Sequence, residues 1–108
     1  MDTMTGKTPT TVTKFSNDAI PFDFLRSTVK ALGGESPRWA KNYYEFHGYT
    51  WSTSFEGIGG QRFELTYRLP YEALGKRVVQ IAYGNQMTFS HPIDAAQGAR
   101  MIAESLRG

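Results

Sequence analysis

The chain has no cysteine, and this absence excludes several kinds of chemistry at once. Disulfide bridges, thiolate zinc sites, iron–sulfur clusters and cysteine nucleophiles all need the missing side chain. Hydrophobic residues make up 40% and aromatic residues 14% of the 108 positions, which is enough side-chain volume for one core without a metal. We therefore expect a single domain that needs no metal and no cofactor.

Long apolar runs are also absent from the sequence. No stretch approaches the length of about 18 apolar residues that a transmembrane helix needs. The first 15 residues contain no apolar segment of the kind that a signal peptide carries. We expect a cytoplasmic protein with no membrane partner.

A strong charge of one sign is missing as well. Twelve Lys and Arg residues against ten Asp and Glu residues give a formal charge of +2. The basic residues are spread along the chain, and Lys76-Arg77 is their only adjacent pair. This balance permits nucleic acid as a partner but does not point to it, because phosphate binding needs clustered cations.

No nucleotide-binding loop, metal-ligand spacing or G-x-S-x-G nucleophile motif occurs in the sequence. Gly6-Lys7-Thr8 lacks the glycine five residues earlier that a phosphate-binding loop requires, and Gly57-Ile58-Gly59-Gly60 lacks the third glycine of a dinucleotide site. The only histidines, His47 and His91, have no second histidine with metal-ligand spacing. A general acid–base pair with a nearby carboxylate is the one catalytic reading left for them, and we expect no enzyme.

Two segments have the pattern of amphipathic helices. Apolar residues at 22, 25, 29 and 32 recur at helical spacing, and Gly33-Gly34 provides a stop. A second helix is expected after Ser90-His91-Pro92, with small and apolar residues at 95, 99, 102 and 106 on one face. Such faces need an apolar surface on which to dock.

Between these helices the pattern changes to that of strands. We expect strands over residues 43–51, 62–69, 77–83 and 86–89, with a two-residue hairpin turn at Gly84-Asn85. Trp39 is placed in a short turn or helix, and residues 1–14 in a flexible polar tail. The predicted fold is α+β, one domain over residues 15–108, with the order α-β-β-β-β-α and both helices on one face of a four-stranded antiparallel sheet.

This order of elements resembles the double-stranded-RNA-binding domain, which also ends in an alanine-rich helix such as the one expected at residues 95–100. That family carries lysines at the start of its last helix to hold phosphates. Here the corresponding stretch, Ser90-His91-Pro92-Ile93-Asp94, has no lysine. The resemblance therefore concerns architecture and implies no RNA binding.

The most suggestive feature is a run of seven aromatic residues between positions 39 and 55. Helices on one side of a sheet cover only one face of a strand, so some of these rings are expected at the surface; the alternative is that they all belong to the core. Exposed Trp, Tyr and Arg dominate both protein interfaces and sites that stack unpaired bases. The predicted binding residues are Arg38, Trp39, Lys41, Tyr43, Tyr49, Trp51, Arg62 and Arg68.

From these observations we expect a small non-enzymatic binding protein that acts as a regulator, adaptor or inhibitor. Chains of this size without motifs are often accessory or phage-type proteins, and we expect this one to be such a protein. Its partner is expected to be another protein, a second copy of the chain being one such partner, bound through segment 39–55. The alternative is a nucleic-acid-binding module that uses exposed aromatics and basic residues of the sheet. That alternative requires the basic residues, including Lys76 and Arg77, to converge on one face with rings between them.

Overall fold

The computed structural model describes residues 9–44, 48–70 and 77–107. These residues form a six-stranded antiparallel sheet in which each strand pairs with its neighbour in sequence. The elements are β1 (Pro9–Phe15), α1 (Asp23–Ala31), β2 (Trp39–Tyr44), β3 (Gly48–Glu56), β4 (Arg62–Leu69), β5 (Val78–Tyr83), β6 (Gln86–Ser90) and α2 (Ala95–Arg107), with short 3₁₀ helices η1 (Asn17–Ala19), η2 (Ile58–Gly60) and η3 (Pro92–Asp94).

The α+β class, the antiparallel sheet and the two helices are confirmed, but the predicted number of four strands is wrong. One extra strand is β1, which takes up residues 9–14 of the expected tail and precedes α1. Its Thr-Thr-Val-Thr run is β-branched, and such side chains favour strands even when the segment is polar. Residues 1–8 lie outside the described part.

The second extra strand comes from dividing the predicted strand 43–51. Trp39 begins β2 and does not lie in a turn or helix, and Gly48 begins β3 with a φ of 96°. Glycine adopts such a positive φ without steric cost, so the chain reverses near this point where the sequence was interpreted as continuous. Residues 45–47 lie outside the described part.

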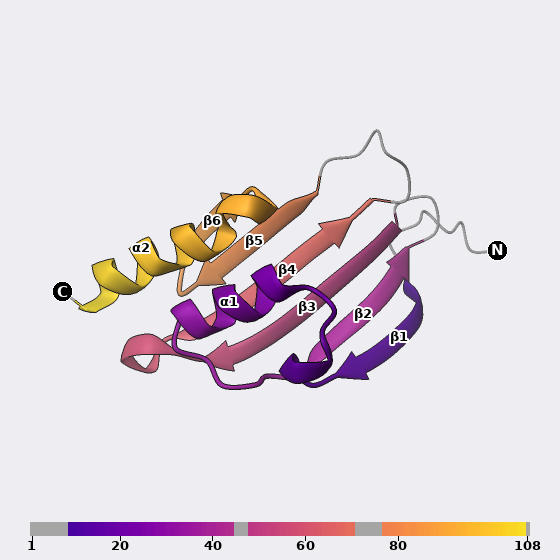
Figure 1. Cartoon of the computed structure of the whole chain (residues 1–108), viewed down its shortest axis with the longest axis horizontal. Helices are drawn as coiled ribbons and strands as arrows, with labels where there is room; N and C mark the ends of the chain where they lie inside the picture. Colours follow the sequence, from indigo (N-terminus) through magenta and orange to yellow (C-terminus); the bar gives the residue numbers. More distant parts are fainter. Residues whose placement is uncertain (1–8, 45–47, 71–76, 108) are drawn as a thin grey trace.

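Both helices lie on the same face of the sheet, as expected. Figure 1 shows α1 in front of β3 and β4, and α2 in front of β5 and β6. The helices also contact each other. One face of the sheet is therefore covered by helices, and the other, which we call the open face, carries neither of them.

The core lies between the helices and the covered face. Strand β4 contributes Phe63, Leu65 and Tyr67, all fully buried, in the alternation that the sequence predicted. The helices contribute the buried side chains Leu25, Val29, Ala95, Ala99 and Ile102, and Leu32 follows α1. Gly33 then takes a φ of 84°, which confirms the predicted stop of the first helix.

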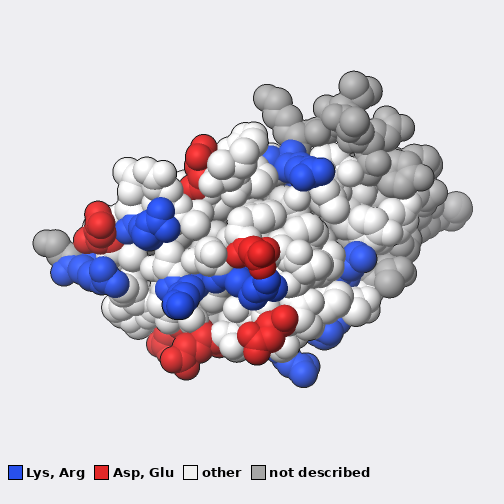
Figure 2. Space-filling view, viewed as in Figure 1, with Lys and Arg blue, Asp and Glu red and all other residues white. Residues whose placement is uncertain are grey.

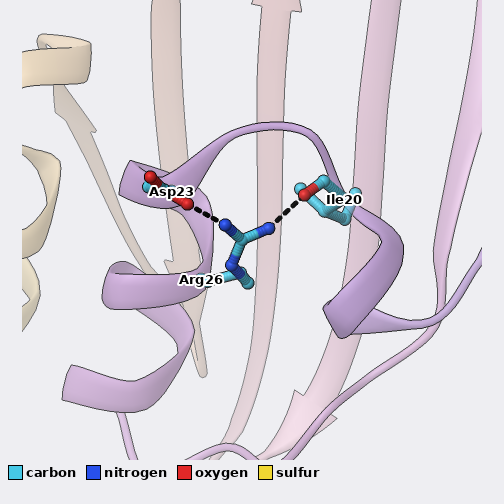
Figure 3. Close-up of polar contacts among 3 residues, drawn as sticks. All are labelled: Ile20, Asp23 and Arg26. Atoms are coloured by element: carbon cyan, nitrogen blue, oxygen red, sulfur yellow. Dashed lines mark hydrogen bonds and ion pairs between the residues drawn. The ribbon is translucent and has the colours of Figure 1, made fainter.

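Two contacts of Arg26 hold the start of α1 against the segment before it. The Arg26 guanidinium donates to the backbone oxygen of Ile20 and pairs with the carboxylate of Asp23, as Figure 3 shows. A second tie links η1 to the sheet, because the indole nitrogen of buried Trp39 donates to Asn17 Oδ1 at 3.1 Å. These contacts fix how the connection between β1 and β2 crosses the covered face.

Candidate functional site

The predicted binding residues do not form a single surface. In the strand register, Trp39, Lys41 and Tyr43 lie on the covered face with Tyr49 and Trp51 of the next strand. Arg62 and Arg68 lie on the open face, and Arg38 lines a hollow on that same side. The expected set is therefore split between two faces by the alternation of β-strands.

The two tryptophans belong to the core. Trp39 is fully buried, and Trp51 packs against Phe15 at 5.0 Å and Phe22 at 5.2 Å between ring centroids. Within the described part of the chain, Trp51 Nε1 is the one buried side-chain nitrogen or oxygen without a hydrogen-bond partner. Aromatic side chains of this size contribute mainly to packing, so Trp39 and Trp51 cannot serve as an exposed anchor in the folded chain.

Three other predicted residues meet at the end of the covered face. Lys41 Nζ lies 4.3 Å from the centroid of the Tyr49 ring and 5.1 Å from that of Trp51. Tyr43 packs on Tyr49 with their centroids 5.1 Å apart. Together with Thr13 they line a hollow of about 210 Å³. The ammonium group is already engaged by two rings, which reduces its availability for another anion.

The open face is the larger candidate surface. Its centre is built from small polar side chains on adjacent strands, since Ser52 of β3 lies opposite Thr66 of β4 and Thr66 lies opposite Gln80 of β5. A hollow of about 490 Å³ extends from Ser52 and Thr66 toward β1, lined by Lys14, Arg38, Trp39, Ala40, Ser52, Thr53, Ser54, Glu64 and Thr66. Hydroxyl groups both donate and accept hydrogen bonds, so such a surface can bind backbone and carboxylate groups alike.

Basic side chains predominate around this hollow. The strand alternation gives the open face Lys14, Arg62 and Arg68, with Arg38 at the rim. Among the described strand residues, the acidic ones on the same face are Glu56 and Glu64. Arg62 is held in place because its guanidinium donates to Ser54 Oγ at 3.0 Å. The open face therefore carries a modest excess of positive charge.

Rings are scarce on this face. Tyr44 lies at one end of β2, and Phe89 lies on β6 at the edge of the sheet. Between them, Ala40, Ser52, Thr66 and Gln80 occupy successive positions across the strands. Base stacking needs rings beside the basic residues, and the four rings among the predicted binding residues, Trp39, Tyr43, Tyr49 and Trp51, lie on the other face.

The side of the molecule that carries the helices shows no concentration of one charge. Figure 2 shows basic and acidic side chains interleaved across this side. Arg77 is exposed here and contacts the hydroxyl of Tyr67 from the covered face. Lys41 also points to this side, and Lys76 lies outside the described residues, so the convergence required by the nucleic-acid alternative is absent among the basic residues that the structure places.

The described residues offer little to support catalysis. They contain no group of three His, Asp or Glu side chains that could hold a metal. His91 is exposed, and His47 lies outside the described part. Among the described residues, one hollow includes Lys14 and Thr66 on the open face, another includes Asn17 and Ser36 beside α1, and a third includes Thr13 and Tyr49. His91 lines none of these three. The acid–base pair that the sequence left open at His91 is therefore not placed in any of these three hollows.

One further catalytic pattern is present at Ser27 and Lys30, whose spacing matches the S-x-x-K motif of serine acyl-transfer enzymes. Both residues line a hollow of about 520 Å³ beside α1. Serine activation by lysine needs a desolvated amine, and both side chains are exposed. The spacing therefore has a simpler explanation as the polar face of an amphipathic helix.

The surroundings of Tyr67 shift the pKa of its hydroxyl group. Burial raises the pKa of its hydroxyl above 10.0, and the neighbouring Arg77 guanidinium, which hydrogen-bonds the hydroxyl, opposes this shift. The net direction is upward because desolvation disfavours the phenolate. A raised pKa keeps Tyr67 neutral at ordinary pH, which suits a core residue and not an acid or base catalyst.

Comparison of the chain with protein-family models, curated proteins and solved structures finds no match in any of the three. The resemblance to the double-stranded-RNA-binding domain is further reduced by the strand before α1 and by the six-stranded sheet. Among the described residues, no helix is long and apolar enough to cross a membrane.

Proposed function

We propose that this chain is a small non-enzymatic binding protein that acts as a regulator, adaptor or inhibitor of another protein. The observation that carries the proposal is the open face, a helix-free sheet surface with a polar hollow of about 490 Å³ and basic residues around it. The proposed contact surface thus moves from segment 39–55 as a whole to this face, on which Arg38, Arg62 and Arg68 remain.

The chemistry of the open face selects the kind of partner. Lys14 and Arg38 beside serine and threonine hydroxyls suit a segment that presents carboxylates together with exposed backbone groups. Positive charge on one face also raises the rate of encounter with an acidic partner and makes that rate depend on salt. The proposed partner is a protein with an acidic surface segment.

Nucleic acid is the second candidate, since the same basic residues would also attract phosphates. The scarcity of rings between them favours the protein partner. The two candidates differ in a simple way, because only a nucleic-acid complex is destroyed by nuclease.

The experiment is a capture assay with three immobilised forms of the protein. These are the wild type, the open-face variant Lys14→Glu/Arg38→Glu, and the control variant Lys30→Glu/Arg100→Glu, which makes the same charge change at exposed positions on the helices. Each form is incubated with cell lysate, with and without nuclease treatment, at two salt concentrations, and bound proteins are quantified by mass spectrometry.

We expect one stoichiometric partner that survives nuclease, binds less at high salt and is recovered at least about 10-fold less by the open-face variant, since close charge pairs at interfaces commonly contribute more than 1.4 kcal/mol. The control variant should recover it as the wild type does. Equal recovery by both variants would refute the open face as the binding surface. Binding that requires intact nucleic acid would replace the protein partner with the second candidate.

A further inference from the structure

The two edge strands of the sheet differ in how they are protected against pairing with another strand. β1 contains Pro9, an irregularity in register between Pro9 and Thr11, and the exposed Lys14. Proline, bulges and lysine are the devices by which proteins block unwanted pairing at sheet edges. The edge at β1 is therefore protected by its own sequence.

The edge at β6 has none of these devices. Its sequence, Gln86-Met87-Thr88-Phe89-Ser90, contains no charge and no proline, and its pairing with β5 is regular throughout. Among the described residues, β6 pairs with β5 alone. Such an edge presents free backbone donors and acceptors to any strand that approaches.

Exposed apolar side chains lie on β6 and on the segment that directly follows it. Among the described residues, the large apolar side chains that are mostly exposed are Val12, Met87, Phe89, Ile93 and Met101. Only Val12 lies elsewhere, on β1; the other four lie on β6 and on the η3–α2 segment that follows it. A Cβ built on Gly98 would lie 3.0 Å from Ser90 Oγ, so Gly98 of α2 lies against the end of β6, and Met101 follows one turn later on the same helix.

We propose that β6 is the interface of a symmetric homodimer, in which β6 pairs antiparallel with β6 of a second copy and the sheet continues across the two chains. The occupant is a second copy because the uncharged edge is self-complementary and because its exposed apolar side chains supply the needed area. Four exposed side chains of this size present on the order of 400 Å² of apolar surface per protomer. Together with the paired backbones, two copies approach the roughly 1,000 Å² that a specific interface needs.

The hairpin determines which residues pair. A two-residue loop at Gly84-Asn85 closes on the pair Tyr83 and Gln86, which exchange backbone hydrogen bonds. Alternation along β6 then directs the N–H and C=O groups of Met87 and Phe89 away from β5. A two-fold axis at Thr88 sets Met87 of each protomer opposite Phe89 of the other, so that all four of these groups on each chain are paired.

In this register the Met87 sulfur of each protomer lies beside the Phe89 ring of the other, on the open face that carries both side chains. The two-fold axis is perpendicular to the sheet, so the open faces of the two protomers lie on the same side. The proposal is independent of the proposed function, because β6 supplies none of the residues that line the open-face hollow. If both proposals hold, the dimer presents two such hollows to one partner assembly.

The first test is the mass in solution, measured by analytical ultracentrifugation over a range of protein concentrations. The wild type should sediment as a dimer. Phe89→Lys should weaken dimerisation at least about 10-fold by placing a charge at the paired edge. Phe89 is 65% exposed and Val12 is 55% exposed, so Val12→Lys on β1 is the matched control and should leave the dimer intact. A wild type that remains monomeric at about 100 μM would overturn the proposal.

The second test measures the register and does not depend on the folding of Phe89→Lys. The chain has no cysteine, so Thr88→Cys introduces a single thiol at the proposed axis, a non-hydrogen-bonded position where the two Cα atoms would lie about 4.5 Å apart. That distance fits a disulfide. Under mild oxidation we expect covalent dimers at least about 10-fold faster than with Val12→Cys at equal concentration. Equal rates, or faster cross-linking of Met87→Cys, would overturn this register.

Discussion

Strand β4 shows the difference between the two faces of the sheet at adjacent residues. Phe63, Leu65 and Tyr67 are fully buried beneath the helices, whereas the residues between them face the side that no helix covers. The same backbone thus contributes the core on one side and a polar surface on the other. The buried contacts that stabilise the fold lie on the covered face. Substitutions on the open face can therefore change binding without unfolding the protein.

The sharpest test of this contrast uses the neighbours Trp39 and Arg38. Trp39→Ala removes a fully buried ring and should lower the free energy of unfolding by about 4 kcal/mol. Arg38→Ala changes an exposed side chain on the open side and should alter it by less than about 0.5 kcal/mol. Urea unfolding followed by far-UV circular dichroism measures both. If Trp39→Ala is too unstable to purify, Trp39→Phe provides a milder loss, and similar losses for Arg38→Ala and Trp39→Phe would contradict the contrast.

A second, smaller effect is expected where the β3–β4 connection touches the end of the first helix. A Cβ at Gly57 would lie 2.1 Å from the backbone oxygen of Leu32 and 2.9 Å from the Phe63 ring. Gly57→Ala should therefore cost roughly 2–3 kcal/mol through overpacking. At Gly59, a Cβ would meet nothing within 4 Å, and the φ of 67° is one that asparagine tolerates. Gly59→Asn should therefore cost only the backbone strain of a side chain at positive φ, about 1 kcal/mol, in the same unfolding assay. Equal losses for the two variants would show that the connection is not closely packed.

A third prediction concerns the buried hydrogen bond from the Trp39 indole to Asn17 Oδ1. Asn17→Ala leaves the buried indole N–H of Trp39 without its acceptor and should cost about 1–2 kcal/mol. Trp39→Phe removes the donor instead, and the double variant Asn17→Ala/Trp39→Phe should lose less than the sum of the two single changes. A double-mutant cycle in urea measures this coupling. Strict additivity would mean that the hydrogen bond contributes nothing to stability.

The smallest expected effect is on pH dependence. Burial raises the pKa of Tyr67 in the folded chain above its unfolded value of 10.0. The folded state then holds a proton that the unfolded state releases, so the contribution of Tyr67 to stability is complete below pH 10.0 and is lost as the pH rises through the folded pKa. Tyr67→Phe should make the decline in stability between about pH 9 and 11 shallower than in the wild type. Parallel declines in the two proteins would contradict a raised pKa.

Several local features could be predicted because they depend on neighbours in sequence. The alternation of β4, the hairpin turn at Gly84-Asn85, the stop at Gly33 and the buried face of α2 all follow from short-range patterns. The strand β1 was missed because polar threonines were weighed for disorder and not for their β-branched shape. The β-branched run itself was the signal that could have revealed it.

The candidate site was predictable only in part. Arg38, Arg62 and Arg68 were recognised as binding candidates, but Lys14, Ser52 and Thr66 were not, since nothing in their local sequence sets them apart. Lys14, Ser52 and Thr66 meet in one hollow because strands β1 to β4 lie side by side in the sheet. Pairing between segments far apart in sequence has no signature in either segment alone.

The sequence by itself determined the class of the fold, because the periods of 3.6 and 2 are properties of each segment and of its own backbone. Only the tertiary structure decided that Trp39 and Trp51 are core residues while Arg38, Arg62 and Arg68 face the other way. An aromatic side chain in a strand is buried or exposed according to which face the helices cover. That choice is made by docking α1 and α2 on one side of the completed sheet.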